Sequence, residues 1–131
     1  MDDTSTSIRV LVVDDEADFR NLMTFWLESK GYKVITASDG RAAIELVKQK
    51  KADIVFMDLR MPIMDGVDAL KNIRTFDATT PIIIISSYIA DPKIQEARSH
   101  GMSGVFYKGA DFDASLPLLE AVLRTHRNLK K

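Results

Sequence analysis

Short runs of β-branched and other apolar residues recur along this chain, with segments of helical spacing between them. The runs cover residues 8–13, 33–37, 54–57, 82–85 and 105–107. Each has the length and composition of a buried strand. Between the first two, apolar residues recur at i, i+3, i+4 and i+7, namely Phe19, Leu22, Met23 and Trp26. That spacing predicts a helix that buries this face.

Four later segments repeat the helical spacing, which gives five helices alternating with five strands. Their apolar positions are Ala43, Ile44 and Val47; Val67, Leu70 and Ile73; Ile94 and Ala97; and Leu118, Leu119, Val122 and Leu123. Such alternation requires crossover connections, so the sequence predicts a doubly wound α/β domain with a parallel sheet. Four consecutive isoleucines at 82–85 are typical of a strand covered on both faces.

Two details of the helices can also be predicted. The aromatic residues Phe19, Phe25 and Trp26 of the first helix are interpreted as core or core-edge residues. The last helix should begin near Ser115 or Leu116, because Pro117 suits the first turn of a helix.

Size and charge restrict the functions that this chain can have. With 131 residues it can close one hydrophobic core, and we interpret 1–7 as a flexible tail and 8–128 as the domain. Lysine and arginine total 18 against 19 acidic residues, so no overall field favours nucleic acid or a membrane surface. No helix-turn-helix pattern follows the last helix, and we expect no direct contact with nucleic acid.

The absence of targeting segments and of cysteine bears on the cellular compartment and on the possible metal ligands. The first seven residues lack the basic start and apolar run of a secretory signal, and no apolar run approaches the roughly 20 residues that span a bilayer. A cytoplasmic location without membrane contact is therefore expected. The chain has no cysteine, so any metal needs oxygen or nitrogen ligands.

Chemically active residues stand where the predicted strands end. Acidic residues 14–16 follow the first strand, Asp58 the third, Ser86 and Ser87 the fourth, and Lys108 the fifth. In an open parallel sheet, ligands bind outside the carboxyl ends of the strands. The sequence thus predicts that carboxylates, a hydroxyl and an ammonium group meet at one edge of the sheet.

Such a cluster is suited to a hard cation and a phosphoryl group. Crowded carboxylates repel one another, and Mg²⁺ prefers oxygen ligands and binds carboxylates together with phosphate oxygens. Asp15 and Asp58 can ligate Mg²⁺ directly, with Asp14 acting through water. A lysine and a serine nearby complete a phosphoryl pocket. An activated carboxylate can then act as the nucleophile and form an acyl phosphate.

Two motifs resemble the receiver domain of bacterial two-component response regulators. They are VLVVDDE at 10–16 and MDLRMPIMDG at 57–66, and the resemblance covers about residues 8–128. It implies a five-stranded parallel sheet of order 2-1-3-4-5 with five flanking helices. It also implies a phosphorelay function in which a sensor histidine kinase or histidine phosphotransfer protein phosphorylates an aspartate with the help of Mg²⁺. The domain would be no enzyme beyond catalysing its own phosphorylation and dephosphorylation.

The resemblance assigns a role to each matching position. Asp58 is the phosphoacceptor, Asp14 and Asp15 form the acidic pair, and the backbone carbonyl of Arg60 is a further metal ligand. Ser86 is the switch hydroxyl and Lys108 the phosphate contact. Ser87 takes the small-residue position beside Ser86. A downstream protein target or a second copy would bind the face formed by the fourth helix, the fifth strand and the last helix.

Two positions depart from the family pattern, and two others shape the pocket. Gly109 replaces the usual proline, so the peptide bond after Lys108 is expected to be trans. Val105 replaces an aromatic residue that rotates on activation, so we expect the signal to travel through the 87–91 and 109–115 loops. Arg60 and Tyr88 should rim the pocket and obstruct the approach of water to the phosphoryl group.

Three other functions share features of this pattern. A haloacid dehalogenase would need a carboxylate two residues after its nucleophile, where this chain has Arg60. A flavodoxin-like carrier would need a phosphate-binding first loop, where the acidic residues 14–16 would repel phosphate. A pseudo-receiver, which binds partners constitutively without phosphorylation, stays open as the alternative because of Val105 and Gly109.

Overall fold

The computed structural model describes residues 8–109 and 111–130, with the side chains of 123 and 125–130 left aside. The predicted tail at 1–7 and the predicted core position of Leu123 lie outside the described residues. The strands are β1 (Arg9–Val13), β2 (Lys33–Ala37), β3 (Ile54–Asp58), β4 (Ile82–Ser86) and β5 (Gly104–Tyr107). The α-helices are α1 (Ala17–Ser29), α2 (Gly40–Lys48), α3 (Gly66–Arg74), α4 (Lys93–Ser99) and α5 (Leu116–Lys130), with a 3₁₀ turn η2 (Asp113–Ser115) before α5.

All five strands are parallel and lie in the order β2-β1-β3-β4-β5. The predicted fold class is therefore confirmed. The last helix begins at Leu116, within the predicted range. No helix among the described residues is long and apolar enough to cross a membrane.

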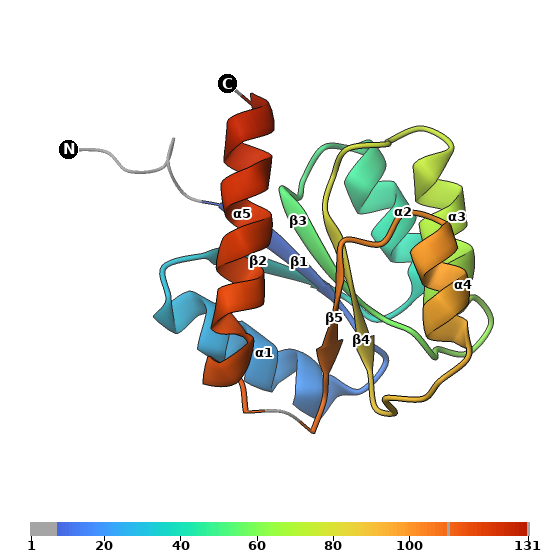
Figure 1. Cartoon of the computed structure of the whole chain (residues 1–131), viewed down its shortest axis with the longest axis horizontal. Helices are drawn as coiled ribbons and strands as arrows, with labels where there is room; N and C mark the ends of the chain where they lie inside the picture. The colour runs from blue at the N-terminus through green and yellow to red at the C-terminus, as the bar shows by residue number, and fades with distance from the viewer. Residues whose placement is uncertain (1–7, 110, 131) are drawn as a thin grey trace.

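Helices cover both faces of the sheet (Figure 1). Residues such as Leu11, Val55 and Ile84 pack against α2, α3 and α4, whereas their neighbours Val12 and Phe56 pack against α1 and α5. Because side chains alternate along a strand and both faces are covered, β3 and β4 are buried along their whole length.

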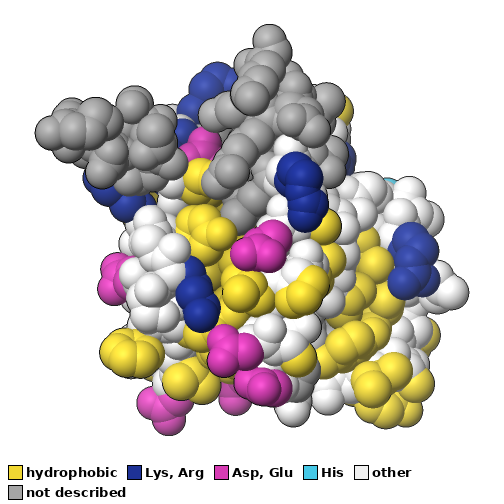
Figure 2. Space-filling model, turned by 60° about the vertical axis from the view of Figure 1, so that its left-hand side comes forward, with side chains coloured by type: hydrophobic (Ala, Val, Ile, Leu, Met, Phe, Trp, Pro, Cys, Tyr) yellow, Lys and Arg dark blue, Asp and Glu magenta, His cyan; other side chains and the backbone are white. Residues whose placement is uncertain are grey.

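Two apolar residues of α1 were wrongly predicted to be buried. The side of α1 that faces the sheet is formed by Met23, Trp26 and Leu27, while Leu22 is 55% exposed and Phe25 is 74% exposed. Both lie on the flanks of the buried stripe, where one step along the helix rotates a side chain by about 100°. Hydrophobic side chains do reach the surface of this domain, and Figure 2 shows them among acidic and basic ones on one face.

The strand register brings the carboxyl ends of the central strands together. Val13 pairs with Met57, Asp58 with Ile85, and Ser86 with Tyr107. Strands β3 and β4 each extend one residue beyond the predicted runs, so Asp58 and Ser86 are the last residues of their strands. The backbone of both residues is consequently held by the sheet.

Candidate functional site

Three aspartates converge at this edge of the sheet. Asp14, Asp15 and Asp58 each offer one carboxylate oxygen, and these oxygens lie within 4.8 Å of one another. Asp14 and Asp58 are buried and Asp15 is exposed. The Asp14 Oδ2 atom is buried, and the Lys108 ammonium lies 3.0 Å from it as an ion pair. Three carboxylate oxygens this close together, two of them from buried residues, fit a divalent cation with oxygen ligands.

The chain after β1 holds the Asp14 carboxylate in place. Its Oδ1 atom accepts a hydrogen bond from the Glu16 backbone N–H at 2.9 Å, which forms an Asx turn before α1. The Arg20 side chain donates to the Asp14 carbonyl at 2.6 Å. One carboxylate oxygen is thereby fixed to the backbone, and the other is left for the pocket.

The Asp58 loop depends on a glycine eight residues later. The Gly66 N–H donates to the Leu59 carbonyl at 2.9 Å, which folds the 59–66 loop back against β3. A Cβ atom on Gly66 would lie 2.3 Å from the carbonyl oxygen of Asp58. This close approach of two backbone segments accounts for the glycine that ends the second motif.

Lys108 supplies the positive charge of the site from the end of β5. Its ammonium Nζ lies 3.0 Å from Asp14 Oδ2 and 3.5 Å from Asp58 Oδ2, forms an ion pair with Glu16, and sits 4.8 Å from the centre of the Phe19 ring. Burial opposes the charged form, but hydrogen bonds to Glu16 and Asp14 and the charge of Asp58 outweigh it and raise the pKa of Lys108. The ammonium is therefore fully charged at neutral pH.

The Asp58 carboxyl group resists ionisation in the absence of a cation. Burial raises the pKa of Asp58 to about 7, the charge of Asp14 adds to this effect, and Lys108 opposes it. A cation in the cluster would reverse the balance and favour the carboxylate.

The two serines at the end of β4 differ in their surroundings. Ser86 is buried, and its hydroxyl donates to the Tyr88 carbonyl at 2.9 Å while accepting the Tyr88 N–H at 3.1 Å. Ser87 is exposed. The Ser86 hydroxyl is thus engaged by the β4–α4 loop and would have to leave the Tyr88 backbone to contact a ligand.

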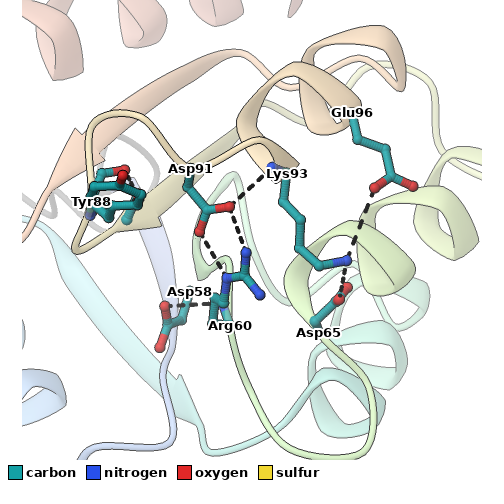
Figure 3. Close-up of polar contacts among 8 residues, drawn as sticks. Asp58, Arg60, Asp65, Tyr88, Asp91, Lys93 and Glu96 are labelled. Atoms are coloured by element: carbon teal, nitrogen blue, oxygen red, sulfur yellow. Dashed lines mark hydrogen bonds and ion pairs between the residues drawn. The ribbon is translucent and has the colours of Figure 1, made fainter.

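An open cavity of about 520 Å³ lies over Asp58. Its lining includes Asp15, Glu16, Asp58, Leu59, Arg60, Ser86, Ser87, Tyr88, Asp91 and Lys108. Arg60 and Asp91 face each other across one side of it, where Arg60 Nε and Nη2 donate to the two Asp91 oxygens at 2.8 and 2.7 Å (Figure 3). This bidentate pair lowers the pKa of Asp91, chiefly through the hydrogen bonds from Arg60.

An aromatic cluster adjoins the site at Lys108, whose ammonium lies over the Phe19 ring. Phe19, Trp26 and Phe106 surround Phe112, with ring centres 5.3 to 6.1 Å from that of Phe112, and Trp26 Nε1 donates to Asp113 at 3.2 Å. Val105 packs against the α2–α4 side of the sheet, and Phe106 is buried on the other. The peptide bond after Lys108 is trans, and a Cβ at Gly109 would meet no atom within 4 Å.

Sequence reasoning missed three residues that shape the site. Glu16 holds Lys108, Asp91 holds Arg60, and Phe112 closes the aromatic cluster. Glu16 stood in the quoted acidic motif, and Asp91 precedes a proline in a strand-end loop, which is a turn signal. Nothing in the sequence indicated that either residue pairs with its particular partner.

Comparisons with known proteins agree with the fold and with the acidic cluster. The transcriptional regulatory protein ZraR of Klebsiella oxytoca is 36% identical over 119 residues, 90% of this chain. The chain spans only 27% of that relative's length. Sporulation initiation phosphotransferase F of Bacillus subtilis is 31% identical over 105 residues, which cover 80% of this chain and 85% of that protein.

Solved structures give the same result. The chemotaxis protein CheY4 of Vibrio cholerae superposes with a TM-score of 0.79 at 30% identity, and the match covers 88% of this chain and 98% of that one. The family model described as the response regulator receiver domain matches residues 10–120. This chain therefore belongs to the response regulator receiver domains of two-component systems, and its acidic cluster fits their phosphoaspartate site.

Proposed function

We propose that this chain is a phosphoacceptor signalling module in which Asp58 receives a phosphoryl group from a histidine. The donor is a sensor histidine kinase or a histidine phosphotransfer protein. The observation that carries the proposal is the position of Asp58: its carboxylate opens into a cavity, with Lys108 Nζ 3.5 Å from Oδ2 and two further aspartates beside it. Family membership supports the same reaction class.

The transfer itself needs only a nucleophile and charge stabilisation. An Asp58 oxygen attacks the phosphorus atom, the bond between phosphorus and imidazole nitrogen breaks, and the imidazole leaves with the electron pair and takes up a proton. Lys108 balances charge on a phosphoryl oxygen, and the Ser86 hydroxyl donates to another after it leaves the Tyr88 carbonyl. Hydrolysis of the acyl phosphate by water returns the carboxylate and releases inorganic phosphate.

The donor set of the cluster fits Mg²⁺. Asp14, Asp15 and Asp58 would hold the ion together with the backbone carbonyl of Arg60. When bound, Mg²⁺ supplies charge neutralisation for the carboxylates and the incoming phosphoryl oxygens. Of this chain's own groups, Asp14 is the most constrained, because its backbone and its Oδ1 atom are both tied to the turn before α1.

The consequence of phosphorylation is a change in the surface that meets a downstream protein or a second copy. That surface comprises α4, β5 and α5, next to Ser86 at the end of β4 and Lys108 directly after β5. The pseudo-receiver alternative predicts partner binding through the same surface without phosphorylation.

The test is incubation with acetyl phosphate and Mg²⁺, read by intact mass. We expect one phosphoryl group on the wild type and none on Asp58→Asn, because the amide is no nucleophile. Asp68→Asn, which removes an exposed carboxylate from α3, should label like the wild type. A folded wild-type protein that takes no phosphoryl group, or an Asp58→Asn variant that labels fully, would overturn the assignment and favour the pseudo-receiver.

A further inference from the structure

The Arg60–Asp91 pair is unequal in its exposure to solvent. The Arg60 side chain is 58% exposed, whereas the Asp91 side chain is only 5% exposed. Both oxygens of Asp91 accept from the guanidinium, and Oδ1 also accepts the Lys93 N–H at 3.0 Å. Arg60 can therefore leave the pair at little cost to itself, while Asp91 would lose its hydrogen-bonded cationic partner in a buried place.

Arg60 is attached directly beside the proposed phosphoacceptor. Its backbone N–H points to Asp58 Oδ1 at 3.4 Å, and its side chain lines the same cavity as Asp58 and Lys108 (Figure 3). A phosphoryl group on Asp58 would occupy this cavity. Rotation of the exposed Arg60 side chain alone would then be enough to bring the guanidinium from Asp91 to the phosphoryl oxygens.

Asp91 in turn organises the start of α4. Its backbone N–H donates to the Tyr88 carbonyl at 3.2 Å, and its carbonyl accepts the Ile94 N–H at 3.0 Å. The next charged residue, Lys93, is paired through Nζ with Asp65 at 2.9 Å, at the N-cap of α3. A movement of Asp91 would thus change the conformation of the β4–α4 loop and of the first turn of α4.

We propose that Arg60 exchanges partners when Asp58 is phosphorylated, leaving the Asp91 carboxylate for the phosphoryl group, and that the release of Asp91 opens the 88–93 segment. The inference rests on the proposed function of Asp58. A phosphoryl group carries about −2 charge near neutral pH and accepts bidentate hydrogen bonds from a guanidinium, so it competes well with a single carboxylate. Asp91 keeps the Lys93 N–H and the weaker influence of the Lys93 charge but loses both guanidinium hydrogen bonds, so its buried carboxylate gains by reaching solvent.

This exchange gives the domain a route for its signal that does not require an aromatic residue at position 105. The route runs from Asp58 through Arg60 to Asp91 and the N-terminus of α4. Linkage makes the coupling reciprocal: whatever weakens the Arg60–Asp91 pair should strengthen the binding of a phosphoryl group.

The first measurement follows Arg60 directly. The ¹H–¹⁵Nε resonance of Arg60 and the amide exchange of residues 88–93 are compared with and without beryllofluoride and Mg²⁺, which mimic the phosphorylated state. We expect the Nε resonance to shift and the exchange to accelerate. If beryllofluoride binds while the Nε resonance and the loop are unchanged, Arg60 stays on Asp91 and the exchange is refuted, with the proposed function intact.

The second measurement is a double-mutant cycle on beryllofluoride affinity. Asp91→Asn should bind about 5-fold or more tightly than the wild type, because Arg60 no longer has a competing partner. In an Arg60→Gln background the same substitution should have little effect, which separates release of Arg60 from the loss of one negative charge. Asp68→Asn, which makes the same Asp-to-Asn change at an exposed position of α3, is the matched control and should bind like the wild type.

Three results would refute the exchange of partners by Arg60. Equal affinities of wild type and Asp91→Asn would indicate a static shield and refute the exchange. An equal gain with and without Arg60 would reduce the effect to simple electrostatics and refute it as well. Failure of the wild-type protein to bind beryllofluoride or to take a phosphoryl group would overturn both the proposed function and the exchange.

Discussion

Two clusters beside the cavity over Asp58 are held by opposite kinds of interaction. On the β5–α5 side, Phe112 and Trp26 pack edge to face, and a hydrogen bond ties Trp26 to Asp113. We call this the aromatic rim. On the β4–α4 side, the pairs Arg60–Asp91 and Lys93–Asp65 form the ionic rim.

The difference indicates which of the two clusters can respond to a new negative charge on Asp58. Contacts between aromatic rings depend on burial and shape, so a new charge on Asp58 changes them little. Pairs of charged groups can exchange partners when a stronger anion arrives. We therefore expect the aromatic rim to keep its packing while the ionic rim rearranges, although the sequence alone had suggested movement in both loops.

The largest expected effect is a loss of stability when the aromatic rim is broken. Phe112→Ala removes the ring that joins Phe19, Trp26 and Phe106, and it should lower the free energy of unfolding by about 2–3 kcal/mol, less than a fully buried phenylalanine because Phe112 is half-buried. Urea unfolding followed by the fluorescence of Trp26, the single tryptophan, measures it.

The control for this variant comes from the other rim. Asp91→Asn should unfold close to the wild-type urea midpoint while changing beryllofluoride affinity, whereas Phe112→Ala should change the midpoint and leave the affinity near that of the wild type. Similar stability losses in the two variants, or a strong loss of affinity in Phe112→Ala, would contradict the assignment of stability to the aromatic rim and of the response to phosphorylation to the ionic rim.

The fold and the convergence of charged groups could both be predicted from the sequence, and the physical reason is the same for both. Strand and helix periods are local properties, and parallel strands necessarily bring Asp14, Asp58 and Lys108 to the same edge. The rims were not predictable, because Asp91 and Phe112 lie in loops whose shape depends on partners distant in sequence. The exposure of Leu22 and Phe25 escaped prediction because helical spacing defines the axis of a buried stripe better than its width.

A smaller effect concerns the carboxyl group between the two rims. The pKa of Asp58, about 7 in the folded metal-free protein, lies above its ordinary value near 4 in an unfolded chain. The folded state therefore binds this proton more tightly, so the stabilisation is fully present below about pH 4 and is lost as the pH rises through about 7. Allowing for solvent screening at the open cavity, we expect a loss of about 1–2 kcal/mol across this range.

The measurement compares unfolding free energies at about pH 5.5 and pH 8 without metal. Asp58→Asn should show a flatter dependence than the wild type, because the amide does not titrate, and Asp68→Asn should follow the wild type. Saturating Mg²⁺ should also flatten the wild-type profile, since the ion favours the ionised carboxylate. Identical profiles for the wild type and Asp58→Asn would indicate that Asp58 ionises at its ordinary pKa.

The smallest expected effect tests backbone strain in the 59–66 loop, which follows Asp58. Ile63 has φ +71°, and the Met64 N–H donates to the Pro62 carbonyl at 2.7 Å, the pattern of a γ-turn centred on a β-branched residue. The Ile63 side chain is 96% exposed, so it loses almost no packing when removed. Ile63→Gly should relieve about 1–3 kcal/mol of strain and return part of it through the entropy of the unfolded chain, for a net gain of about 0.5–1 kcal/mol.

Ile89→Gly is the matched control for this strain, because Ile89 is also exposed, at 76%, and has no positive φ. It should be less stable than the wild type, since glycine there only adds freedom to the unfolded chain. Among the described residues, Lys50 and Ile63 are the two non-glycine residues with positive φ, and neither belongs to the aromatic rim. If Ile63→Gly stabilises the protein while beryllofluoride affinity changes, strain in the 59–65 loop is part of the balance that Arg60 adjusts. A variant that is destabilised as much as Ile89→Gly would show that the turn carries no strain.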